Sequence, residues 1–172
     1  MEINTPYKNY FEKYTALVPE SNVDKALEAQ DAKLNEFISR VSEENGAYAY
    51  REGKWTLKEM LQHLIDTERI FTYRALAIAR KDEANLPGYD ENNYADNSAA
   101  NRRTWASLAA EIMSLRKCTK LLFQSFTEEM LASAGTFNNI TGDVNTLGFI
   151  IVGHAYHHIQ IAEEKYFPAI SK

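Results

Sequence analysis

Long stretches of the chain keep the residue spacing of an amphipathic helix and contain few residues that would interrupt one. Only seven glycines and four prolines occur in 172 residues. Apolar side chains recur three and four residues apart, which places them on one face of a helix. The alternation of apolar and polar residues that is typical of strands is almost absent. The pattern therefore predicts a chain of helices that bury one face against each other.

Five helices are expected, one short and four long. The short one lies near the N-terminus, between Pro6 and Pro19. The long ones are expected from Ser21 or Asn22 to about residue 41, ahead of Asn45-Gly46; from Thr56 to about Arg80; from Ser98 or Asn101 to Phe126; and from near Asn145 to about Phe167, ahead of Pro168. The start at Thr56 is the best marked, because Thr56 and Glu59 form a capping-box pattern.

The connection between the second and third long helices determines the topology. It has about 17 residues, from Lys81 to Asn97. An extended chain of that length spans roughly 50 Å, whereas a helix of about 24 residues is only about 36 Å long. This connection can therefore run the full length of a bundle and leave the two helices parallel. The predicted fold is all-α: one four-helix-bundle domain over residues 1–172, with a long crossover between helices 2 and 3 (up-down-down-up) and a short N-terminal helix.

Composition argues against several classes of function. The net charge is −5 and the basic residues form no stripe, so no nucleic-acid partner is expected. No apolar run approaches the roughly 20 residues of a membrane span, and no signal-peptide pattern is present. Cys118 is the only cysteine and cannot form an internal disulfide, which favours a cytoplasmic protein. A bundle with this many aromatic residues is compatible with a homodimer.

Three of the four histidines lie within five residues, near the end of the last predicted helix. His154 and His158 are four residues apart and therefore share one helix face. His63 belongs to another predicted helix. Two histidines from one helix and one from another can form a three-nitrogen metal site with an open coordination position. The alternative is that they are ordinary core or surface histidines, although buried imidazoles without partners would leave polar nitrogens unsatisfied.

Other residues near these histidines are candidates for supporting roles. His157 points about 60° round the helix from His154. It is either a hydrogen-bond donor to a metal ligand, a residue at the entrance of the site, or an ordinary half-exposed histidine. Glu68 and His157 are the candidates for a general acid or base. Asp66 and Glu68 are also candidates for orienting a ligand, with ordinary surface charge as the alternative. Tyr89, Asp90, Glu91 and Tyr94 either cap the pocket or belong to a solvated loop.

Two segments resemble known motifs, in matching order. Residues 53–69, Gly-Lys-Trp-Thr-Leu-Lys-Glu-Met-Leu-Gln-His-Leu-Ile-Asp-Thr-Glu-Arg, resemble the second-helix motif of the DinB-like family of metal-binding four-helix bundles. Residues 153–161 are similar to the last-helix motif of that family, a histidine followed three and four residues later by two more. The resemblance covers nearly the whole chain and includes residues 86–92 in the crossover.

The resemblance implies parallel second and third helices and one divalent metal held by His63, His154 and His158, with His157 as an additional histidine. Zinc or nickel is expected, and iron or manganese remains open. Members of the family include thiol-dependent S-transferases and isomerases, proteins named as metal-dependent hydrolases, and many without an assigned activity. Nothing in the resemblance implies DNA chemistry.

Three functions follow as hypotheses. The first is a metal-dependent transferase that activates a low-molecular-weight thiol toward a small electrophile, because a divalent cation lowers the pKa of a bound thiol. The second is a metal-dependent hydrolase that uses bound water at the same site. The third is a bundle in which the metal only stabilises the fold or a binding surface.

Overall fold

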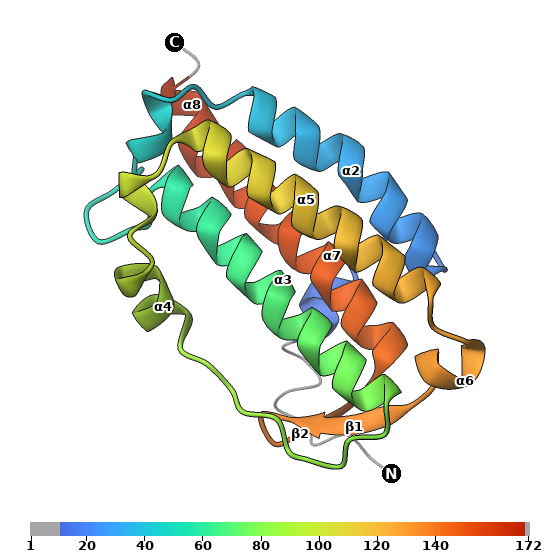
Figure 1. The fold of residues 1–172 in the computed structure, drawn as a ribbon. Coiled ribbons are helices and arrows are strands. Elements are labelled where there is room, and N and C mark those ends of the chain that lie inside the picture. The colour runs from blue at the N-terminus through green and yellow to red at the C-terminus, as the bar shows by residue number, and fades with distance from the viewer. Residues whose placement is uncertain (1–10, 171–172) are drawn as a thin grey trace.

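The computed structural model describes residues 11–170 and places four long helices side by side (Figure 1). These are α2 (Val23–Ser39), α3 (Leu57–Ala79), α5 (Trp105–Gln124) and α7 (Val144–Ile161). Helices α2 and α7 run in one direction, and α3 and α5 run in the other. Both α2 and α3 pack against α5 and α7. The predicted four-helix bundle with up-down-down-up topology is therefore confirmed.

Side chains that accept backbone amide protons mark the starts of the long helices. Asn22, Thr56, Thr104 and Asp143 are the N-cap residues, and each accepts from an amide in the first turn. The predicted capping box is present, since the amide of Thr56 donates to Glu59 Oε2 at 2.7 Å and the amide of Glu59 donates to Thr56 Oγ1 at 3.1 Å. These local contacts explain why the starts of α2, α3 and α7 agree with the sequence pattern.

Apolar side chains from all four helices fill the space between them. The largest fully buried ones include Leu27, Leu34, Phe37, Leu61, Ile65, Leu108 and Phe123. They recur at helical spacing, so burial of one face of each helix stabilises the bundle. None of the helices in the described part of the chain combines the length and the apolar character that crossing a membrane requires.

The crossover from α3 to α5 is longer than predicted. It contains α4 (Glu91–Asn97) and the 3₁₀ helix η2 (Ala100–Arg102), and α5 begins only at Trp105. The predicted start of this helix at Ser98 or Asn101 was wrong. Ser98 ends α4, and Ala99 has a left-handed conformation with φ 53°, which interrupts any helix through this point.

A β-hairpin, absent from the sequence prediction, lies between α5 and α7. A short helix, α6 (Glu128–Leu131), leads into the antiparallel strands β1 (Ala134–Phe137) and β2 (Ile140–Asp143). The amide of Leu86 in the crossover donates to the carbonyl of Thr136 at 3.0 Å, and the amide of Asn138 donates to the carbonyl of Leu86 at 2.7 Å. The hairpin therefore joins the crossover to one end of the bundle.

The remaining segments differ from the prediction in detail. A 3₁₀ turn, η1 (Asn45–Ala47), lies between α2 and α3. Beyond α7 the chain continues as a π-helical stretch, η3 (Ala162–Tyr166), and then as α8 (Phe167–Ile170). The predicted stop at Pro168 was wrong, because Pro168 lies in the first turn of α8, where a missing amide is tolerated. Of the predicted N-terminal helix, residues 11–15 are helical, and its earlier part lies outside the described residues.

Candidate metal centre

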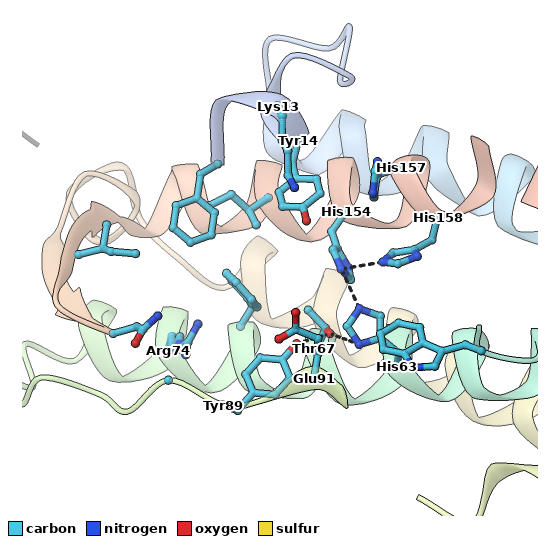
Figure 2. A pocket seen from close by; sticks show the side chains of 17 residues that line it. Lys13, Tyr14, His63, Thr67, Arg74, Tyr89, Glu91, His154, His157 and His158 are labelled. Carbon is cyan, nitrogen blue, oxygen red and sulfur yellow. Dashed lines mark hydrogen bonds between the residues drawn. The ribbon is translucent and has the colours of Figure 1, made fainter. Parts of the chain in front are cut away.

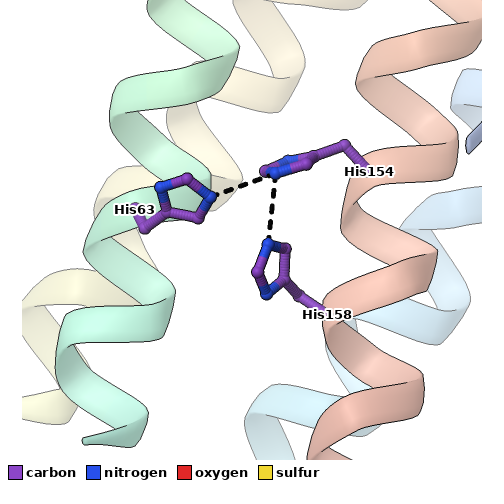
Figure 3. Close-up of side chains that lie close together, drawn as sticks. All are labelled: His63, His154 and His158. Atoms are coloured by element: carbon purple, nitrogen blue, oxygen red, sulfur yellow. Dashed lines mark hydrogen bonds between the residues drawn. The ribbon is translucent and has the colours of Figure 1, made fainter. Parts of the chain in front are cut away.

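The histidines from the two separate motifs meet at one point between α3 and α7 (Figure 3). The Nε2 atom of His154 lies 3.0 Å from Nε2 of His63 and 3.1 Å from Nε2 of His158. One nitrogen from each ring lies within 4.8 Å of the others, and all three side chains are buried. The structure therefore brings together the three residues that the sequence singled out as metal ligands.

Burial keeps these imidazoles neutral. It lowers the pKa of His63 to about 4. Burial, with a smaller contribution from the neighbouring histidines, holds the pKa values of His154 and His158 well below the ordinary value. Each ring at neutral pH therefore carries one N–H group and one free lone pair, which is the state that binds a metal.

The contacts among the three rings fit a bound cation better than they fit hydrogen bonds. A neutral ring nitrogen has either one proton or one lone pair, so Nε2 of His154 cannot make good hydrogen bonds to both neighbours. A cation between the rings would use all three lone pairs. Nitrogens about 2.0–2.1 Å from a tetrahedral zinc lie roughly 3.3 Å apart, close to the two separations of 3.0 and 3.1 Å at His154 Nε2. Because all three histidines line a cavity, a cation held by them would have room for a fourth ligand.

Aromatic and hydroxyl side chains surround the cluster. The Trp55 ring lies 4.7 Å from that of His63, and the Tyr14 ring lies edge-on to His154 at 5.3 Å. Thr67 Oγ1 is 3.5 Å from Nδ1 of His63 and 2.6 Å from the hydroxyl of Tyr89. Tyr89, through Thr67, therefore links the crossover to a histidine of the cluster.

A cavity of about 550 Å³ extends from the histidines toward the hairpin (Figure 2). Its walls come from the N-terminal segment, α3, the crossover, the hairpin and α7; they include Phe11, Lys13, Tyr14, Trp55, Phe71, Arg74, Tyr89, Glu91, Ile140 and Ile150. This volume is typical of a site for a small molecule. The crossover residues Tyr89 and Glu91 thus lie at the pocket.

The two candidate acid–base residues lie in different surroundings. His157 is half-buried and lines the cavity, with its ring 5.4 Å from that of Tyr14. Glu68 does not line this cavity. It is buried between α3 and α5, where its carboxylate pairs with Arg116 at 2.7 Å and accepts from Thr119 at 2.5 Å. Asp66 accepts from Gln62 at 2.8 Å and likewise lies away from the cavity.

Sequence reasoning missed Arg74 as a residue of this pocket. His63, Thr67, Phe71 and Arg74 all line the cavity and are spaced by four, four and three residues. Such spacing places them along one face of α3. This spacing could be read from the sequence, but it pointed to a shared pocket only once the structure had placed the histidine cluster at one end of that face.

Comparison with known proteins agrees with this fold and shows the family. The sequence model of the DinB superfamily matches residues 26–162. A protein of Oceanobacillus iheyensis, named "Putative metal-dependent hydrolase", is 23% identical over 138 residues, which are 78% of each chain. The solved structure of YfiT from Bacillus subtilis, described as a probable metal-dependent hydrolase with an unusual four-helix bundle topology, has a TM-score of 0.69 at 17% identity and covers 95% of this chain and 90% of YfiT. The family match includes His63, His154 and His158, and this chain belongs to the DinB superfamily.

Proposed function

We propose that this chain is a metal-dependent hydrolase that acts on a small molecule bound in the cavity. The observation that carries the proposal is the meeting of three buried, neutral imidazoles at one end of a pocket of about 550 Å³. Both relatives carry the words metal-dependent hydrolase in their names, which supports the same class of reaction. Zinc or nickel is the expected ion, and iron or manganese would fit the same three nitrogens.

Three neutral ligands leave the full charge of a divalent cation at the open position, where it would lower the pKa of a bound water toward about 7. The protein residues then have two tasks. Trp55, Tyr14 and Phe71 exclude bulk water, which strengthens the electrostatic interactions inside the pocket. Thr67, held by Tyr89, orients the ring of His63.

Glu91 is the best placed residue for proton transfer. Among the described residues that line the cavity it is the only acid. Figure 2 draws it on the crossover side, between Arg74 and the histidines. A carboxylate there can accept a proton from the attacking nucleophile and return it to the leaving group. His157, which lines the opposite wall, is the histidine of the pocket that lies outside the three-histidine cluster.

The test uses protein reconstituted with one zinc or nickel per chain and panels of esters, amides and lactones, without any thiol. Turnover is expected, with its loss in His63→Ala. Glu91→Gln should lower kcat by about a hundredfold or more, since general acid–base catalysis contributes roughly 10²–10⁴. Glu83→Gln, an exposed acid in the same crossover, is the matched control and should keep the wild-type rate. If the Glu91→Gln variant retains full activity, Glu91 is not the residue that transfers the proton.

Thiol transfer is the second candidate, supported by the size of the cavity. A volume of about 550 Å³ leaves room for an electrophile beside a small thiol at the histidines. A thiol needs no general base once its pKa is lowered by a cation. Product formation from thiol and electrophile, with no hydrolysis in the thiol-free panels, would favour this reaction over hydrolysis. A metal-dependent rise in melting temperature with no turnover in either assay would instead indicate a non-enzymatic, metal-stabilised bundle.

A further inference from the structure

Arg74 is a buried cation at the end of the cavity away from the histidines (Figure 2). Its residue surface is only 4% exposed. One guanidinium nitrogen, Nη2, donates to the carbonyl of Pro87 at 2.8 Å, and the guanidinium lies 4.9 Å and 5.1 Å from the ring centres of Phe71 and Phe137. Its Nε is buried without a hydrogen-bond partner. Within residues 11–170, no carboxylate pairs with this arginine.

The other two buried cations in the described part of the chain have acidic partners. Arg116 pairs with Glu68, and Lys58 pairs with Glu43 at 2.5 Å. Even Arg69, on the exposed side of the same helix as Arg74, is 2.6 Å from Glu111. Because an uncompensated charge is unfavourable in a buried position, the missing anion at Arg74 is the exception that needs an explanation. A ligand anion in the cavity would supply it.

The position of Arg74 defines the length of such a ligand. Arg74 follows His63 by eleven residues on one face of α3, so their Cα atoms are roughly 16 Å apart along the axis. Side chains on a helix lean toward its N-terminus, which shifts His63 and Arg74 in the same direction, so the two ends of the site stay roughly 16 Å apart. Phe71, Ile140 and Ile150 line the cavity, so its walls are partly apolar.

We propose that Arg74 binds the carboxylate of an elongated small-molecule substrate whose reacting group lies at His63, His154 and His158. The planar fork of a guanidinium matches a carboxylate, and Nη2 already fixed by Pro87 leaves the other donors for the ligand. The apolar part of the substrate would lie against Phe71. This inference rests on the proposed function for the position of the reacting group, and it narrows the substrate class to organic acids.

The experiment measures binding of ω-mercaptoalkanoic acids by titration calorimetry with zinc-loaded protein. Chain lengths run from 3-mercaptopropanoic acid to 8-mercaptooctanoic acid, and each acid is compared with the ω-mercapto alcohol of equal length. We expect the longer acids to bind about tenfold or more tightly than the matched alcohols, since hydrogen bonds between charged groups are among the strong ones. The shortest pair should show no difference.

Variants test whether Arg74 causes the preference for acids over alcohols. Arg74→Gln should remove the preference for acid over alcohol, Arg74→Lys should keep part of it, and Arg69→Gln should leave it unchanged. Equal binding of acids and alcohols to the wild-type chain at every length, or an unchanged preference in Arg74→Gln, would overturn the proposal. If Arg74→Gln fails to fold, the comparison of acids with alcohols on the wild-type chain and on Arg74→Lys still decides it.

Failure of the proposed function has a different signature. If the protein holds no zinc, thiols will not bind at the histidines, and the proposed chemistry is wrong. The carboxylate subsite is then tested on zinc-free protein with octanoate against octanamide. Tighter binding of octanoate, lost in Arg74→Gln, would uphold Arg74 as an anion site, and equal binding would reject it.

Discussion

The backbone of Tyr14 lies so close to Gly153 that a methyl group on this glycine would overlap the Tyr14 carbonyl oxygen. This approach seats the N-terminal segment on α7, next to the histidine cluster, and places the Tyr14 ring against His154. Only a residue without a side chain permits it. Gly153, the residue before His154, thus allows the segment around Tyr14 to close one side of the cavity.

Gly153→Ala should displace the segment around Tyr14 without disturbing the helix. Overpacking is unfavourable by about 1–3 kcal/mol, and the better helix propensity of alanine offsets about 1 kcal/mol of that. Hydrogen exchange at residues 11–18 should become faster. Gly148→Ala is the control, since its methyl group would meet side chains of Val23 and Phe123 instead. Unchanged exchange in Gly153→Ala would mean that the segment is not held by this contact.

Metal content should depend on three histidines and not on the fourth. Elemental analysis of untagged protein should give near one divalent metal per chain in the wild type and in His157→Ala. The His63→Ala, His154→Ala and His158→Ala variants should lose it, because two nitrogens hold a cation far less firmly than three. Saturating metal at about a thousand times Kd should stabilise only the binding-competent chains, by about 4 kcal/mol. Equal metal content in all five proteins would contradict histidine ligation.

The metal-free protein should lose stability as the pH falls. Burial lowers the pKa of His63 to about 4 in the folded chain, while the unfolded chain has a pKa near 6.5. The unfolded state therefore binds more protons between these values, so the free energy of unfolding is highest above about pH 6.5 and decreases toward pH 4. His63 alone accounts for roughly 3 kcal/mol of this decrease. Urea unfolding across this range should show a shallower dependence in His63→Leu than in the wild type.

Removing only one member of the buried pair Glu68 and Arg116 should destabilise the fold more than removing both. Both side chains are only 2% exposed. Arg116→Leu leaves the carboxylate without its cation and should lower the free energy of unfolding by about 3–5 kcal/mol. Replacing both residues, as Glu68→Leu with Arg116→Leu, should restore much of that loss, because no charge stays buried. A double-mutant cycle in urea tests this, and a double variant less stable than Arg116→Leu would refute the reasoning.

Local features explain what the sequence predicted well. The helical spacing, the capping box at Thr56 and the spacing of His154 and His158 all involve residues within one or two turns. The crossover length then favoured parallel helices on geometric grounds alone. The three candidate ligands lie together in the structure, while metal binding itself stays a prediction.

Features that depend on packing escaped prediction. Ala99 gives no sequence warning of its left-handed conformation, so α5 seemed to begin early. The hairpin strands are only four residues each, too short for a clear alternation, although Asn138-Asn139 with positive φ at both positions is a favourable turn. Glu68 lies about 100° round α3 from Thr67 and pairs with Arg116 on α5, outside the main cavity, so a role for it as acid or base stays a prediction.

The separation of the candidate ligands along the chain also affects how the protein is made. His63 precedes His154 by 91 residues. At about 5–20 residues per second, a ribosome needs roughly 5–18 s to synthesise the stretch between them. During that interval α7 does not yet exist, and a nascent chain offers a metal only a single imidazole. Any loading of the three-histidine cluster with a metal would therefore have to wait until α7 has left the ribosome, so metal uptake would report that α7 has folded against α3.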